Sequence, residues 1–230
     1  MGKGKSKFTT VITLIVGAAI VGGLWKFNQC AISYNQYLVG NLIALFWLPM
    51  LTIMFMFREE PEKFGFCLGS WKRIWAVLLV CMACLVPIML YAARLPAYQA
   101  YYPLFRHYPE FWNVFNTYPQ NSPWTSAPMQ MLYAEVSYGM YMFCWEFFFR
   151  GYLLLGLMRS MGWWAVIIQA LAFGLLHFGK PTTEVIASFG AGVILGIIAL
   201  NAKSFVPGFV LHWLASMTFD MLVVASRPHH

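Results

Sequence analysis

The sequence places a carboxylate and a guanidinium four residues apart inside an otherwise apolar run. Residues 144–151 read CWEFFFRG, in which Glu146 and Arg150 are the ionisable pair. On a helix this spacing puts both side chains on one face, and Glu on the amino-terminal side of Arg is the favourable order. Ionisable groups within a membrane are costly and usually face a bundle interior or a wet cavity. The pair therefore predicts a functional site.

More ionisable residues follow in the next apolar runs. His177 ends one run before the helix-breaking residues 179–181, and Glu184 opens the next run. His212 and Ser216 are four residues apart, which gives the last run a polar face. We expect Glu146, His177, Glu184 and His212 to converge. The polar residues that stand inside or at the ends of apolar runs are Glu135, Glu146, Arg150, His177, Glu184, His212 and Asp220.

The composition requires that a membrane hold these residues. The chain has 230 residues, of which 60% are hydrophobic and only 10% are charged, and this excludes an ordinary soluble domain. The net charge of +7 comes from scattered Lys and Arg, with no basic stripe that would bind nucleic acid. Of the five cysteines, only Cys81 and Cys84 have CxxC spacing, and no second pair accompanies them. Neither a disulfide framework nor a zinc knuckle is indicated.

Long apolar runs predict an all-α fold, a polytopic transmembrane bundle of about seven spans, because a span needs about 20 apolar residues. Six prolines interrupt residues 93–128, which predicts an aromatic, Pro-rich interfacial loop rather than a continuous helix. The expected spans are residues 9–25, 37–57, 74–92, 129–158, 163–178, 184–200 and 205–225.

The chain is expected to form one integral membrane domain with two parts. Residues 1–128 would be an amino-terminal transmembrane scaffold with the interfacial loop, and residues 129–228 would carry the chemistry. Nine basic residues fall in loops on the side of the amino terminus, against five on the other side, so we expect that terminus in the cytoplasm. The nine are Lys3, Lys5, Lys7, Arg58, Lys63, Lys72, Arg73, Arg159 and Lys203; the five are Lys26, Arg94, Arg106, Lys180 and Arg227.

Three motifs occur in order along the second part. They are WEFFFR at residues 145–150, FGLLH at 173–177 and HWLAS at 212–216. Together they resemble the patterns E-E-x-x-x-R, F-x-x-x-H and H-x-x-x-N of the CPBP family of intramembrane glutamic proteases, also called the CAAX-protease, bacteriocin-processing or Abi family. Three ordered motifs are far more specific than one. The resemblance covers residues 129–220.

The resemblance implies an intramembrane endopeptidase that needs no metal and no cofactor. Its substrate would be a membrane-anchored protein or peptide, processed in the manner of carboxy-terminal processing or sorting enzymes, and membrane lipids would surround it in a bacterial inner membrane. A carboxylate oriented with His177 would activate water, Arg150 would fix that carboxylate, and His212 with Ser216 would stabilise the oxyanion.

The chain departs from the family pattern at two positions. Trp145 stands where the family has the Glu that is usually assigned to activating water, and Ser216 stands in place of Asn. Tryptophan accepts no proton, so Glu146, or next Glu184, would have to be the base. Residues 177–184, HFGKPTTE, accompany the WEFFFRG form in a subset of bacterial relatives that the chain also resembles, which favours an adapted site.

Other interpretations of the same residues stay open. The chain could be a catalytically silent CPBP relative that binds a membrane protein partner as an assembly or immunity factor, or a metalloenzyme, although HExxH and zinc-ligand spacing are absent. Glu146 and Arg150 could form a purely structural ion pair. Glu184 could only complement a helix dipole, and Gly192 and Gly196 could only allow close helix packing.

Overall fold

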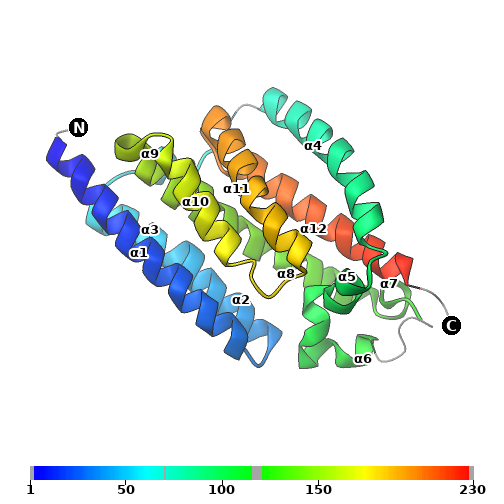
Figure 1. The fold of residues 1–230 in the computed structure, drawn as a ribbon. Helices are drawn as coiled ribbons and strands as arrows, with labels where there is room; N and C mark the ends of the chain where they lie inside the picture. Colours follow the sequence, from blue (N-terminus) through cyan, green and yellow to red (C-terminus); the bar gives the residue numbers. More distant parts are fainter. Residues whose placement is uncertain (1–2, 70, 116–120, 228–230) are drawn as a thin grey trace.

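The computed structural model describes residues 3–69, 71–115 and 121–227, which form a bundle of helices (Figure 1). The main helices run between two ends of the molecule, and the two termini lie at opposite ends. The long helices are α1 (Lys3–Cys30), α2 (Tyr34–Leu42), α4 (Trp71–Ala92), α8 (Pro128–Glu146), α10 (Trp164–Leu175), α11 (Thr182–Ala202) and α12 (Val206–Ser226). Two short α-helices extend longer helical runs: α3 (Leu48–Leu51) belongs to the second run, which starts with α2, and α9 (Gly156–Met161) belongs to the fourth run, which starts with α8.

Each expected span coincides with a helical run, which confirms the all-α polytopic bundle. Within the described residues, five helical runs are long and apolar enough to cross a membrane: Ser6–Cys30, Tyr34–Phe57, Trp75–Ala92, Thr182–Ala202 and Val206–Ser226. Helix α10 has only 12 residues. The α8–η6–α9 run, residues 128–161, is long enough but is interrupted by polar residues of the candidate site.

Three segments of the helical runs are π-helical: η1 (Ile43–Trp47), η2 (Thr52–Phe57) and η6 (Phe147–Leu155). Segment η6 begins directly after Glu146 and contains Arg150. Stretches of π-helix re-aim side chains and are frequent at functional sites. Apolar periodicity alone does not predict them.

Residues 93–128 form no continuous helix, as expected. The described part consists of α5 (Pro96–Tyr101), α6 (Trp112–Phe115), α7 (Pro123–Ser126), and the short 3-10 turns η4 (Leu104–His107) and η5 (Pro109–Phe111). A further 3-10 turn, η3 (Pro61–Phe64), lies in the connection from η2 to α4. Oε1 of Glu110 accepts a hydrogen bond from the backbone N–H of Tyr34 at 2.9 Å, which ties the loop to α2. We call the end of the bundle that carries this loop the loop end.

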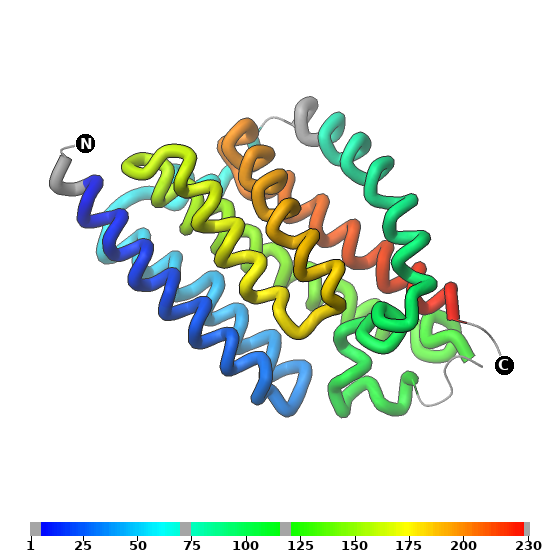
Figure 2. Tube along the Cα trace, in the orientation of Figure 1, coloured from blue at the N-terminus to red at the C-terminus, as the bar shows by residue number. Residues whose placement is uncertain are grey.

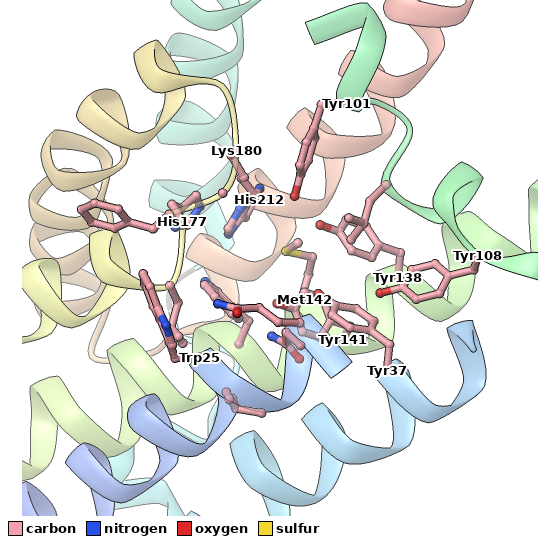
Figure 3. A pocket seen from close by; sticks show the side chains of 18 residues that line it. Trp25, Tyr37, Tyr101, Tyr108, Tyr138, Tyr141, Met142, His177, Lys180 and His212 are labelled. Carbon is pink, nitrogen blue, oxygen red and sulfur yellow. The ribbon is translucent and has the colours of Figure 1, made fainter. Parts of the chain in front are cut away.

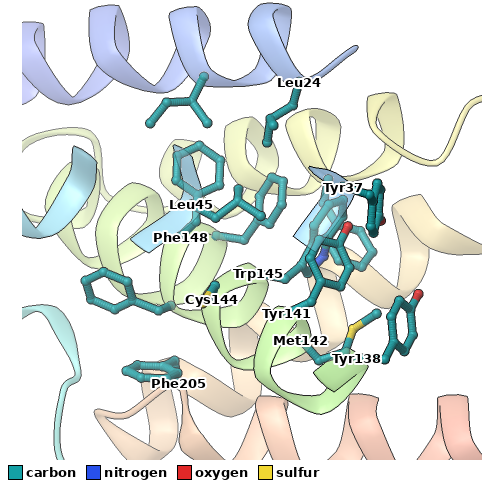
Figure 4. Close-up of a cluster of buried hydrophobic side chains, with 14 of the residues drawn as sticks. Leu24, Tyr37, Leu45, Tyr138, Tyr141, Met142, Cys144, Trp145, Phe148 and Phe205 are labelled. Carbon is teal, nitrogen blue, oxygen red and sulfur yellow. The ribbon is translucent and has the colours of Figure 1, made fainter. Parts of the chain in front are cut away.

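The core lies between the α8–η6 run and the two amino-terminal helical runs (Figure 4). Phe147, Phe148 and Phe149 are all fully buried. Phe148 lies beside Leu45 of the second run. The amino-terminal part of the chain therefore packs directly on the helix that carries Glu146.

Helices α10 and α11 pack closely, whereas α4 stands apart from α11 and packs on α12 (Figure 2). A Cβ atom at Gly192 would lie 2.9 Å from the Cα of Ala170, and Nε2 of Gln169 donates to the carbonyl of Gly192 at 2.8 Å. The glycine therefore allows the close helix packing considered from the sequence.

Candidate active site

The predicted Glu146–Arg150 pair is present and fully buried. Nε of Arg150 lies 3.2 Å from Oε2 of Glu146, and neither side chain is exposed. The other carboxylate oxygen, Oε1, lies 2.8 Å from Nδ1 of His212. A Cβ atom at Gly208 of α12 would come within 2.9 Å of Oε2, so the glycine leaves space for the carboxylate between α8 and α12. Glu146 is thus held from two sides.

Arg150 is stabilised by an aromatic ring as well as by the carboxylate. Its Cζ atom lies 4.1 Å from the ring centroid of Phe173 and 5.7 Å from that of Phe149. Cation–π contacts of a desolvated guanidinium contribute on the order of 2 kcal/mol. The two terminal nitrogens have no hydrogen-bond acceptor among the described residues. Arg150 is therefore placed to fix Glu146 and Phe173 rather than to reach solvent.

Both histidine rings are held through the same ring atom, Nδ1. Nδ1 of His177 lies 2.8 Å from the carbonyl oxygen of Phe173, which can only accept, so Nδ1 carries the proton. Nδ1 of His212 faces the Glu146 carboxylate in the same way. In a neutral ring, Nε2 is then the acceptor in both residues. Each histidine is fixed by its neighbour as a potential proton acceptor at Nε2.

Both histidines line a cavity of about 220 Å³ at the loop end, which we call the polar cavity (Figure 3). Its walls come from α1, α2, α5, η4, α8, α12 and the loop that joins α10 to α11. The sequence assigned the chemistry to residues 129–228, and the walls of this cavity extend to the amino-terminal helices and the interfacial loop. The lining includes Trp25, Asn28, Gln29, Tyr37, Tyr101, Tyr108, Tyr138, Tyr141, Trp145, His177, Lys180 and His212.

The same two histidines also line an apolar pocket of about 450 Å³ between α4 and α11, with α12 as its floor; we call it the lateral pocket. A second apolar pocket of about 420 Å³ continues between the same helices and shares Cys81 and Ile194 with the first. Together they form an apolar groove along α4 and α11. His177 and His212 thus stand between a polar space and an apolar one.

Glu184 belongs to a network at the start of α11. Its Oε1 accepts hydrogen bonds from the Tyr102 hydroxyl at 2.6 Å and from Nζ of Lys180 at 2.8 Å. Burial lowers the pKa of Lys180, but Glu184, Tyr101 and Asp220 together raise it above its usual value, so the ammonium stays charged at neutral pH. Burial also raises the pKa of Tyr102 well above its usual value, which keeps its hydroxyl a donor. Glu184 lines the lateral pocket, not the polar cavity.

The remaining candidates differ in position. Trp145 is 4% exposed, lines the polar cavity, and its ring centroid lies 5.7 Å from that of His177. Ser216 is half-buried one turn beyond His212 and lines neither the polar cavity nor the lateral pocket. Its assignment to the oxyanion stays a prediction. Glu135 and Asp220 are both 2% exposed and lie on α8 and α12.

Sequence reasoning did not include Lys180 and the tyrosines of the polar cavity among the site residues. Lys180 stands in the HFGKPTTE stretch, so its place between His177 and Glu184 was the available signal. The tyrosines come from α2, α5, α8 and the loop, and only the fold brings them together. Among the described residues, no three His, Cys, Asp or Glu side chains are grouped to hold a metal ion.

Comparison with known families gives a match in the segment that carries the candidate site. The family described as type II CAAX prenyl endopeptidase Rce1-like matches residues 128–218, which contain all three motifs. This match supports the similarity of the segment to the CPBP family. No curated protein and no solved structure gave a significant match to the chain. The matched segment runs from α8 into α12, and the helices before it supply additional walls of the polar cavity.

Proposed function

We propose that this CPBP-family membrane protein is an intramembrane endopeptidase that hydrolyses a peptide bond of a membrane-anchored protein or peptide. The observation that carries the proposal is the 2.8 Å contact between Oε1 of Glu146 and Nδ1 of His212. The His212 side chain is 17% exposed on the cavity wall, whereas Glu146 is not exposed at all. The pair links a buried carboxylate to a space that water can enter.

In the proposed reaction, His212 takes the role that the missing family Glu would have had. Glu146 holds the Nδ1–H tautomer, so Nε2 of His212 removes a proton from a water molecule as that water attacks the scissile carbonyl. The carboxylate stabilises the imidazolium that forms, and Nε2–H then gives its proton to the leaving amine. Arg150 holds the carboxylate in position. His177, on the same wall, orients the attacking water.

The apolar groove between α4 and α11 supports a substrate that arrives from the bilayer. Its lining at α4 and α11 is mostly aliphatic, and it leads to the same histidines that face the polar cavity. An apolar segment of a membrane-anchored substrate would lie there, with its peptide bond next to His177 and His212.

We assign the protein to a bacterial inner membrane with a cytoplasmic amino terminus. With the seven spans expected from the sequence, the carboxyl end then lies outside the cytoplasm. A phosphatase reporter that is active only outside the cytoplasm should therefore be active when it is fused after residue 227.

Cleavage can be tested with a co-expressed reporter that joins a fluorescent domain, one membrane span and a randomised tail ending in an epitope. We expect loss of the epitope with the parent protein. His212→Gln and Glu146→Gln should slow the loss by about 10²–10⁴-fold, because the first removes the base and the second removes the carboxylate that orients it. Glu184→Gln reports on the other candidate base. The exposed Glu60→Gln is the matched control. Size-exclusion profiles in detergent show whether each variant folds, and a zinc chelator should not change the rate.

A silent, partner-binding relative is the second candidate, and one observation favours it. The Trp145 ring lies between Phe149, Phe173 and His177, at the position of the usual base. If no tail is ever cut, but a membrane protein co-purifies and is lost with Trp145→Ala, this function replaces the endopeptidase. If the His212 and Glu146 variants cut as fast as the parent, the proposed mechanism is wrong.

A further inference from the structure

The polar cavity contains a single fully charged side chain. Among the described residues that line it, Lys180 is the one Lys or Arg, and no Asp or Glu is present. Its counter-charge, Glu184, lines the lateral pocket instead. The positive end of this ion pair therefore faces the polar cavity, which favours a ligand group with negative charge there.

The rest of the wall is rich in groups that hydrogen-bond to a peptide. Five tyrosines and two amides line the cavity, and in Figure 3 Lys180, His212 and Tyr101 lie together on one side of it. Tyrosine hydroxyls and amides both donate and accept. These groups suit a polar, extended segment rather than an acyl chain. The tyrosines are Tyr37, Tyr101, Tyr108, Tyr138 and Tyr141, and the amides are Asn28 and Gln29.

The backbone places the Lys180 ammonium firmly beside the histidines. Gly179 has φ +99°, a conformation that favours glycine, and the Lys180 N–H then donates to the carbonyl of His177 at 3.1 Å. The ammonium donates to the Tyr102 hydroxyl at 3.1 Å and to Glu184 at 2.8 Å. An ammonium has three N–H donors, so these two bonds leave one for a ligand. The side chain is 17% exposed.

We propose that Lys180 binds a carboxylate of the ligand, so that the segment seated in the polar cavity is a polar peptide that ends in a carboxylate or carries an acidic side chain. The location of the scissile bond next to His177 and His212 rests on the proposed function; the carboxylate site does not. A ligand would then lie with its acidic part at Lys180 and its apolar part in the groove between α4 and α11.

The test measures binding by fluorescence anisotropy in detergent micelles with three labelled heptapeptides of Ala and Leu. One has a free carboxyl terminus, one an amidated terminus, and one an amidated terminus with Glu as its sixth residue. We expect at least one carboxylate peptide to bind about tenfold more tightly than the neutral amide. The peptide that gains affinity identifies the source of the carboxylate, terminal or side-chain. Mass spectra of the same samples report cleavage separately.

Variants separate binding of the peptide carboxylate by Lys180 from a purely structural role of Lys180 in the loop between α10 and α11. Lys180→Met should abolish the tenfold preference and Lys180→Arg should retain most of it, while the exposed Lys26→Met, next to the cavity residue Trp25, should retain all of it. Glu184→Gln should keep or increase the preference, because it removes the competing carboxylate. Equal binding of all three peptides to the parent protein overturns the proposal. So does a preference that survives Lys180→Met, or one that Glu184→Gln removes as Lys180→Met does.

Discussion

At the residue scale, burial decides which carboxylate can do chemistry and how. Glu146 is enclosed by Arg150, His212 and the space left by Gly208, so under the proposed function it would act on the cavity only through the His212 ring. Glu184 reaches a pocket directly, but two donors already hold its Oε1. The difference in environment, rather than the residue type, separates their roles.

The first residue-scale prediction concerns Arg150. Arg150→Leu would leave the buried Glu146 carboxylate without its cation, and removing one partner of a buried pair costs about 3–5 kcal/mol. The midpoint of thermal unfolding in detergent should fall markedly. The double variant Glu146→Leu with Arg150→Leu should be more stable than the single one, because no buried charge is left unpaired.

An unchanged midpoint for Arg150→Leu would show that the pair is solvated, contrary to its burial. Loss of activity in that variant alone is no measure of catalysis, since the fold itself is weakened. The activity of Glu146→Gln, which keeps the size and hydrogen-bonding capacity of the side chain, separates the two effects.

At the element scale, the sequence predicted where the helices lie and that Glu146 pairs with Arg150, because those follow from apolar run length and helical spacing. The four-residue spacing of Glu146 and Arg150 was enough to predict their contact. It did not predict the π-helix η6 that begins at Phe147. That segment depends on packing by all of its neighbours, and a single helix's pattern of residues does not contain this information.

The element-scale prediction uses two glycines of α11. Gly192→Ala would place a methyl group 2.9 Å from the Cα of Ala170, a backbone atom, and should destabilise the protein by about 1–3 kcal/mol. A Cβ atom at Gly190, on the same helix, would meet nothing within 4 Å, so Gly190→Ala should be neutral or slightly stabilising. Unfolding in mixed micelles compares the two, and equal stability of both variants would contradict the close packing of α10 and α11.

At the scale of the whole molecule, the chain brings together parts that are far apart in sequence. The CPBP motifs could be found from residues 145–216 alone, but the walls of the polar cavity also come from α1, α2 and the interfacial loop. Apolar spans carry no signal for which of their faces borders a cavity. The sequence therefore predicted a scaffold for residues 1–128, and the structure gives these residues a part in shaping the site.

The groove between α4 and α11 yields the last prediction. Ala191 of α11 lines the lateral pocket, so Ala191→Trp should fill it and slow cleavage of the membrane-anchored reporter by about tenfold or more, the loss expected when a substrate's apolar contacts are blocked. Binding of the short heptapeptides in the polar cavity should change little, because Ala191 does not line that space. Gly190→Trp, one residue away in open surroundings, is the control for added bulk. If Ala191→Trp and Gly190→Trp cleave the reporter at equal rates, substrates reach His177 and His212 by another route; if Ala191→Trp weakens peptide binding as strongly as it slows cleavage, the two spaces are not separate.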